Sequence, residues 1–164
     1  MLKILIFSDS HGRTDGMLAA LEGHPDATHC FHLGDGYRDA ALVAAQRPGI
    51  LFASVRGNCD GPFAEGAAEE MVLDLGGRRL WLCHGHRYGV KSGTEGLLGR
   101  AAEMDASLVL FGHTHRPLEC YVGEPREVYL FNPGSIREGS YGLLRLDRCR
   151  VLFSHCHMPP ARSW

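Results

Sequence analysis

Five short apolar runs recur along the chain, and a polar side chain that can bind a metal ion follows each of them. The runs are rich in Ile, Leu, Val and Phe, are short enough for buried strands, and have a Gly or Ser close behind them. They are Leu2–Phe7, Thr28–Leu33, Ile50–Val55, Leu80–Cys83 and Leu108–Phe111. We therefore predict five buried strands, each of which delivers a polar residue at its carboxyl end.

Helical segments separate the first three runs. One begins at Thr14, a good N-cap residue, and continues to about Glu22, where Gly23 ends it. A second covers about Tyr37 to Gln46 and ends before the sequence Arg47-Pro48-Gly49. Strands that alternate with helices of this length are expected to lie parallel and to be joined by right-handed crossovers.

Beyond residue 65 the pattern becomes mostly β. A hairpin around Gly76-Gly77 and a helix over Thr94–Met104 come first. Four further strands are predicted at Leu118–Val122, Glu127–Phe131, Tyr141–Leu146 and Cys149–His155. Helices with two sets of strands indicate an α/β protein, a layered sandwich whose two sheets lie face to face. No internal repeat or linker interrupts the chain, so we expect a single domain over residues 1–164.

Composition narrows the class of protein. The chain has 164 residues, of which 45% are hydrophobic and 22% charged, as in ordinary globular proteins. A net charge of −2 without any basic run argues against coating nucleic acid. No apolar stretch reaches the ~20 residues of a membrane span, and the N-terminal run is too short for a signal peptide. The six cysteines form no CxxC pair, which favours free thiols and the cytoplasm.

The polar residues behind the five runs are expected to meet, because ligands gather outside the carboxyl ends of strands in open α/β sheets. The candidate metal ligands are Asp9, His11, Asp35, Asn58, His84, His113 and His115. Seven such groups are enough for two divalent ions. Mixed imidazole, carboxylate and amide ligands suit Mn²⁺, Fe, Co, Ni or Zn better than Mg²⁺ or Ca²⁺. Two carboxylates leave a surplus of positive charge that would attract phosphate and acidify bound water, which predicts a metal-dependent phosphoesterase.

Each motif has an ordinary structural explanation when it is taken alone. Asp35 could cap a helix, and Asn58 could sit in a plain turn. It is the complete ordered set that favours a metal site. Two points stay open: His86 either reaches the second metal or lines the cleft, and the Gly-rich segment 85–99 is either a mobile lid or a solvated surface loop.

The ordered motifs D-x-H, G-D, G-N-C-D, H-G-H and G-H-T-H, followed by N-P-G-S, resemble the calcineurin-like metallophosphoesterase family. The likeness is to its small bacterial and archaeal phosphodiesterase branch, and it extends from Lys3 to about Arg145. The resemblance implies a four-layer α-β-β-α sandwich, in which two mixed β-sheets lie face to face and are flanked by helices. It also implies a binuclear centre that is commonly supported by manganese.

Carried over position by position, the resemblance also assigns roles. Asp9, His11 and His115 would hold the first metal, Asp35 would bridge both, and Asn58, His84 and His113 would hold the second. A hydroxide between the ions would attack the phosphorus of a small phosphodiester substrate in line.

The G-N-C-D motif supplies the catalytic candidates Asn58, Cys59 and Asp60. Many relatives carry His at the position of Cys59, where it is thought to protonate the leaving group. A thiol is a poorer hydrogen-bond donor, so we expect a preference for activated leaving groups such as phenolates. Asp60 is expected to orient a ligand or its loop.

Other functions remain under consideration. A phosphomonoesterase or nucleotidase would use the same chemistry, and the fold also resembles the retromer sorting subunit, a scaffold that binds protein partners. The enzyme is favoured because no ligand position is missing. The natural substrate, the metal that is loaded in the cell, and a homodimer formed through the strands of the tail are left open by the sequence.

Overall fold

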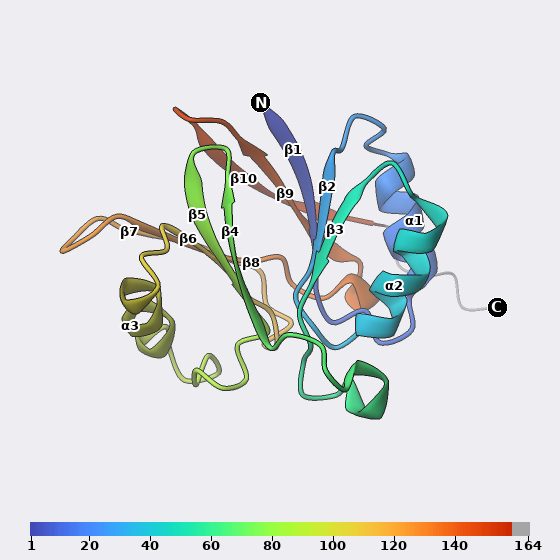
Figure 1. Ribbon diagram of the computed structural model, residues 1–164, viewed down its shortest axis with the longest axis horizontal. Coiled ribbons are helices and arrows are strands. Elements are labelled where there is room, and N and C mark those ends of the chain that lie inside the picture. The colour runs from blue at the N-terminus through green and yellow to red at the C-terminus, as the bar shows by residue number, and fades with distance from the viewer. Residues whose placement is uncertain (159–164) are drawn as a thin grey trace.

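The computed structural model describes residues 1–158, which form two five-stranded sheets packed face to face (Figure 1). The first sheet has the order β10 (Val151–His157), β9 (Ser140–Leu146), β1 (Leu2–Phe7), β2 (His29–His32) and β3 (Leu51–Ser54). The second has the order β4 (Glu70–Leu75), β5 (Arg78–Cys83), β6 (Leu108–Leu110), β8 (Val128–Asn132) and β7 (Leu118–Val122). These are the two sheets that the sequence predicts.

Both sheets are mixed. In the first, β1, β2 and β3 are parallel, β9 pairs antiparallel with β1, and β10 pairs antiparallel with β9. In the second, β5, β6 and β8 are parallel, and β4 and β7 are antiparallel edge strands. The parallel strands matter for function, because all the predicted ligands come directly after five of them.

Helices cover the outer faces of the two sheets, which gives the predicted α-β-β-α order. In Figure 1, α1 (Thr14–Glu22) and α2 (Tyr37–Gln46) lie on one side, and α3 (Glu95–Glu103) lies on the other. Short 3₁₀ helices follow β3 (η1, Gly61–Ala64) and β8 (η2, Ile136–Glu138). Among residues 1–158 no helix combines the length and apolar character needed to cross a membrane.

Strand alternation separates the core into layers. On β1, Ile4 and Ile6 point between the sheets, whereas Leu5 and Phe7 point toward α1 and α2. A third apolar cluster, which includes Trp81, fills the space between the second sheet and α3. Each sheet is therefore buried on both faces, which explains why the central strands read as continuous apolar runs.

One helix start differs from the sequence prediction. Arg13 rather than Thr14 is the N-cap of α1, and no side chain caps the helix there. The preceding loop sets the direction of the chain instead. In that loop the N–H of Arg13 donates to Ser10 O, and that of Thr14 donates to Gly12 O.

The inter-sheet core predicts the effect of a truncation. Leu144 is fully buried between the sheets, so Leu144→Ala is expected to lower the free energy of unfolding by about 2–5 kcal/mol. Leu152, which is 49% exposed on β10, provides the control. Leu152→Ala should change the free energy of unfolding by less than about 1 kcal/mol. Urea denaturation measures both values. Equal losses in the two variants would contradict this packing.

Candidate metal centre

The ends of strands from both sheets bring six of the seven predicted ligands into two clusters. One cluster contains Asp9, His11 and His115, and the other contains Asp35, His84 and His113. Within each cluster the three ligand atoms lie within 4.8 Å of one another. Each cluster draws on both sheets, because the residues after β1 and β2 belong to the first sheet and those after β5 and β6 to the second.

The two clusters adjoin each other around the carboxylate of Asp9. Its Oδ1 lies 3.1 Å from Nε2 of His115 and 3.9 Å from Nε2 of both His11 and His84. The Nε2 atom of His11 is also 3.9 Å from Oδ2 of Asp35. Asp9 is fully buried, and among residues 1–158 its Oδ1 has no hydrogen-bond partner. A buried, unpartnered carboxylate oxygen that faces imidazoles fits a cation.

Two of the histidines are held in the tautomer that a metal ligand needs. Nδ1 of His84 lies 2.7 Å from Leu33 O, which can only accept, so Nδ1 carries a proton, while Nε2 faces the cluster, 3.3 Å from Asp35 Oδ2 and 3.2 Å from His113 Nδ1. Nδ1 of His115 lies 3.1 Å from Glu138 Oε1, while its Nε2 faces Asp9. A carboxylate behind a ligand histidine fixes the ring and raises its basicity.

Most of the candidate ligands have a backbone conformation that non-glycine residues rarely adopt. The φ angles are 54° at Asp9, 44° at His11, 55° at Asp35, 69° at His113 and 58° at His115. Each such residue costs on the order of 1–3 kcal/mol, and the surrounding structure must supply that energy. Left-handed residues turn the chain sharply and aim successive side chains at one point.

This conformation corrects the reason for which Asp9 and His11 were expected to act together. The sequence suggested an extended segment, in which residues two apart point the same way. The segment is in fact a loop, in which both residues have positive φ. The two side chains do converge, but the turns of the backbone bring them together.

The loops approach so closely that glycine is required. A Cβ at Gly112 would lie 1.9 Å from Ser8 Oγ and 2.8 Å from Asp9 Oδ2. A Cβ at Gly57 would lie 2.1 Å from Asp35 Oδ1. The glycines beside the ligands therefore allow loops from different strands to meet around the site.

A polar scaffold that the sequence analysis missed supports Asp9 and the His113–His115 loop. Oδ2 of Asp9 accepts hydrogen bonds from Ser8 Oγ and from the N–H of His113, and Ser135 Oγ donates to Asp9 O at 2.8 Å. Buried Asn132 donates to Gly112 O at 3.0 Å. The N-P-G-S sequence after an apolar strand is the available signal for this scaffold.

Asp60 ties two ligand loops together through backbone groups. Its Oδ2 accepts from the N–H groups of Asp35 (2.9 Å) and Gly57 (2.6 Å). Its Oδ1 accepts from Gly36 and Tyr37 at the start of α2. Three of the four bonds hold the β2–α2 loop, which carries Asp35, against the loop after β3, so Asp60 acts here as a positioning residue.

Asn58 and Cys59 occupy the exposed side of the site. The amide of Asn58 lies 3.3 Å from Cys59 Sγ, and the N–H of Cys59 donates to Asp35 Oδ1 at 2.8 Å. Ligation by Asn58 stays a prediction. Burial and the negative charge of Asp35 raise the pKa of the Cys59 thiol. The thiol is therefore protonated near neutral pH and is not a thiolate nucleophile.

The charges of the second cluster depend on one another. Burial opposes ionisation of Asp35, but hydrogen bonding and charge from His84, with the Cys59 N–H, outweigh it and lower its pKa. Burial likewise opposes protonation of His84, yet Asp35 and Asp9 raise its pKa overall. Burial and the neighbouring charges of His84 and Lys91 lower the pKa of His113. Two carboxylates therefore draw positive charge to this point, which a metal ion can supply.

His86 lies beside the second cluster without belonging to it. Its ring centroid is 5.4 Å from that of His84 and 6.1 Å from that of His113. Its Nδ1 is buried and has no hydrogen-bond partner within the described part of the chain. Both roles proposed for it from the sequence therefore remain predictions.

A cleft of about 180 Å³ gives access to the ligands from one side. His11, Asp35 and Cys59 line it, together with Arg38 and Phe63, whose side chains stack with 5.1 Å between the guanidinium carbon and the ring centroid. An exposed aromatic ring and a cation beside candidate metal ligands can receive an ester group and its phosphate.

The positioning role of Asp60 can be tested without any activity assay. In Asp60→Asn an NH₂ group must replace one of two oxygens that each accept two backbone N–H bonds. We expect a loss of about 2–3 kcal/mol in the free energy of unfolding, measured in urea, and weaker metal binding by calorimetry. Asp147, which accepts two backbone N–H bonds in the exposed β9–β10 turn, provides the control. Asp147→Asn should leave metal binding unchanged. If both variants weakened metal binding equally, the positioning role of Asp60 would be contradicted.

Comparisons with known proteins agree with this geometry. Residues 2–157 match the family described as the calcineurin-like phosphoesterase superfamily domain. The "Probable metallophosphoesterase YsnB" of Bacillus subtilis (strain 168) is 32% identical over 155 residues, which cover 89% of this chain and 85% of that protein.

Solved structures show the same fold. A novel archaeal phosphodiesterase has a TM-score of 0.73 at 19% identity, with 96% of this chain and 100% of that chain covered. Zinc-bound Vps29 from Entamoeba histolytica has a TM-score of 0.73 at 20% identity, with 95% and 99% covered. The match over residues 2–157 and the relative at 32% identity together show that the chain belongs to the calcineurin-like phosphoesterase superfamily.

Proposed function

We propose that this metallophosphoesterase is a phosphodiesterase with a binuclear metal centre, in which manganese is the favoured metal and Fe, Co, Ni or Zn are alternatives. The observation that carries the proposal is the pair of adjacent three-residue clusters, in which the unpartnered Oδ1 of Asp9 lies 3.1 Å from Nε2 of His115 in its own cluster and 3.9 Å from Nε2 of His84 in the other. Asp9, His11 and His115 would hold one ion, His84, His113 and Asn58 the other, and Asp35 would bridge them. The proposed location remains the cytoplasm.

The protein's own groups prepare the site for this chemistry. Two divalent ions, when bound, supply hydroxide near neutral pH and neutralise charge on the phosphoryl oxygens. Glu138 and Leu33 O orient His115 and His84, so that these rings need not reorganise when a substrate arrives. Asp60, in the loop after β3, binds the backbone of the loop that carries Asp35 and thereby fixes the distance between the two loops.

The surroundings of the centre support a diester more than a monoester. On one side lies the cleft of His11, Cys59 and Phe63, and on another lies a larger pocket that reaches Thr114, the residue between His113 and His115. A diester carries two organic groups, and each would have a place to lie. A phosphomonoesterase would leave one of these sites without a function.

The scaffold alternative finds less support. Vps29 shares the fold, but the sequence identity is too low to transfer a role. The polar network that holds the ligands here involves Ser8, Asp60, Asn132, Ser135 and Glu138. A surface that only docks proteins has no need of five groups that aim side chains at one buried point.

The principal test is hydrolysis of bis(p-nitrophenyl) phosphate by chelator-stripped protein, with and without Mn²⁺. We expect turnover to return with the metal. It should fall on the order of 100-fold or more in Asp35→Asn, because the variant removes the negative charge of the ligand that would bridge both ions. Asp147→Asn is the matched control and should keep wild-type turnover. Faster hydrolysis of p-nitrophenyl phosphate than of the diester would favour the monoesterase, and inactivity with every first-row metal would favour the scaffold.

A second test addresses the leaving group. Cys59 lines the cleft as a protonated thiol, which is a weak donor to an alkoxide. We expect Cys59→His to speed hydrolysis of alkyl p-nitrophenyl phosphates at the alkyl ester bond at least about tenfold, with little gain at the phenolate bond. Cys149→His, at an exposed turn, controls for an added imidazole. An unchanged ratio of alcohol to phenol products would remove the support for this role of Cys59.

A further inference from the structure

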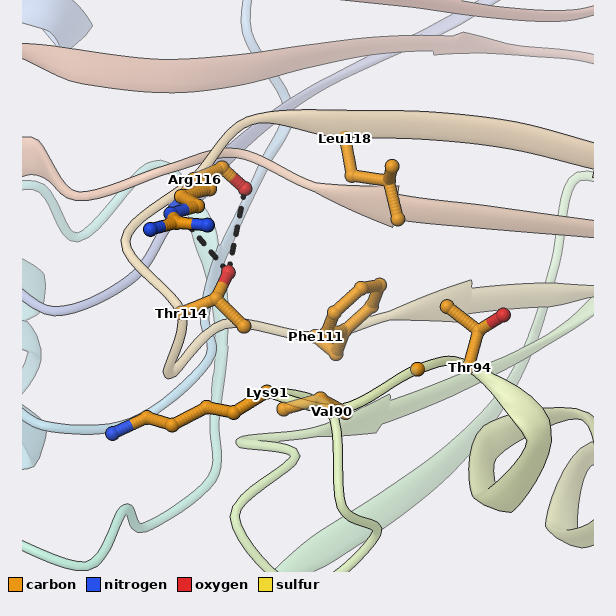
Figure 2. Close-up of a pocket in the computed structure, with 8 residues that line it drawn as sticks. Val90, Lys91, Thr94, Phe111, Thr114, Arg116 and Leu118 are labelled. Carbon is orange, nitrogen blue, oxygen red and sulfur yellow. Dashed lines mark hydrogen bonds between the residues drawn. The ribbon is translucent and has the colours of Figure 1, made fainter.

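A second, larger pocket of about 420 Å³ opens beside the loop that carries His113 and His115. Figure 2 shows its lining side chains, which come from the Gly-rich segment before α3 and from the chain between β6 and β7. The lining side chains include Val90, Lys91, Phe111, Thr114, Arg116 and Leu118. Its volume falls within the range of small-molecule sites, roughly 300–1,000 Å³.

Thr114 lines the pocket and belongs to the loop that carries two candidate metal ligands. This residue lies between two candidate ligands, and its hydroxyl accepts hydrogen bonds from Asn132 Nδ2 at 3.0 Å and from the N–H of Arg116 at 3.2 Å. Those bonds fix the wall that the pocket shares with the centre. A molecule with its scissile phosphate at the clusters could therefore extend into this space.

The two halves of the pocket differ in character. In Figure 2 the ammonium group of Lys91 and the guanidinium of Arg116 extend toward the Thr114 end, whereas Phe111 and Leu118 line the part farther from it. Phe111 is almost fully buried, with 2% of its surface exposed, whereas Leu118 is 36% exposed. The end near the clusters is thus cationic, and the far part is apolar.

The cations of the pocket also differ from those on α3 and in the β7–β8 loop. Arg100 is paired with Glu70 and Glu103, and Arg126 with Asp105. Within residues 1–158 the side chains of Lys91 and Arg116 have no ion pair. Two unpaired cations around a concave site, with an aromatic ring beyond them, are suited to a phosphate attached to a ring system.

We propose that this pocket binds the half of the substrate that carries a second phosphate and a planar ring, as a nucleotide does. The inference rests on the proposed phosphodiesterase function and deepens it. The scissile phosphate would lie at the two clusters, the second phosphate between Lys91 and Arg116, and the ring against Phe111 and Leu118. Hydrolysis breaks one P–O ester bond and adds water, so the products are an alcohol and a phosphate monoester.

Binding can be measured apart from catalysis. Calorimetry on the chelator-treated full chain would compare adenosine 5′-monophosphate with adenosine. We expect the nucleotide to bind at least about tenfold more tightly, because only it reaches the cations. Arg116→Gln and Lys91→Gln should each remove most of that difference in affinity. Leu118→Ser, at a residue that is 36% exposed, should weaken the binding of both ligands. Arg148→Gln, in the exposed β9–β10 turn, is the charge-matched control. Equal affinity for the two ligands, or an equal effect of the control, would overturn the proposal.

Turnover measurements then test the phosphodiesterase activity and the specificity of the pocket separately. The manganese-loaded enzyme would be given diadenylate with and without a 5′-phosphate, and bis(p-nitrophenyl) phosphate. We expect a kcat/KM at least about tenfold higher for the phosphorylated dinucleotide, and a smaller ratio in Arg116→Gln. Hydrolysis of all three without any preference for the added phosphate would refute the pocket and keep the phosphodiesterase. Hydrolysis of none of them, alongside the expected nucleotide binding, would refute the phosphodiesterase and keep the pocket as a nucleotide site.

Discussion

The buried carboxylate of Asp9 is the point on which the rest of the site depends. It is inaccessible to solvent, and one of its oxygens faces three imidazoles without a hydrogen bond from the described chain. An uncompensated buried charge is expensive, so the fold must stabilise it or pair it with a cation. Hydrogen bonds from Ser8 Oγ and from the N–H of His113 to the other oxygen stabilise the charge, and the imidazoles around Oδ1 leave a place for a cation.

Strained loops around a rigid body follow from that requirement. Five candidate ligands have left-handed backbone angles, which together cost on the order of 5–15 kcal/mol. Such loops persist because each follows a strand that is packed into the core. Asp60 adds three bonds to backbone N–H groups where α2 begins and a fourth to Gly57 after β3. The precision of the site thus depends on the packed core and on groups that never touch a substrate.

The sequence predicted much of this arrangement, because the signals were local. The run Leu2–Phe7 and the helix Tyr37–Gln46 have the predicted bounds, since apolar periodicity and a Pro-Gly stop define them within a few residues. The candidate ligands could be named because each follows a predicted strand, and metal binding by them stays a prediction. Glu138 could not be found in this way, since its contact with His115 spans 23 residues and depends on the path of η2. The left-handed conformation of Asp9 and His11 was likewise invisible, because non-glycine residues carry no strong signal for positive φ.

The division of the ligands between two sheets has a consequence for the order of events in the cell. Neither sheet alone holds a complete cluster, since Asp9 and His11 need His115, and Asp35 needs His84 and His113, from the opposite sheet. A metal ion cannot guide the folding of either sheet alone. It can bind tightly only after the two sheets have packed against each other. Metal acquisition is then a late step of maturation. The ion that an enzyme molecule carries reflects the supply in the compartment where folding is completed.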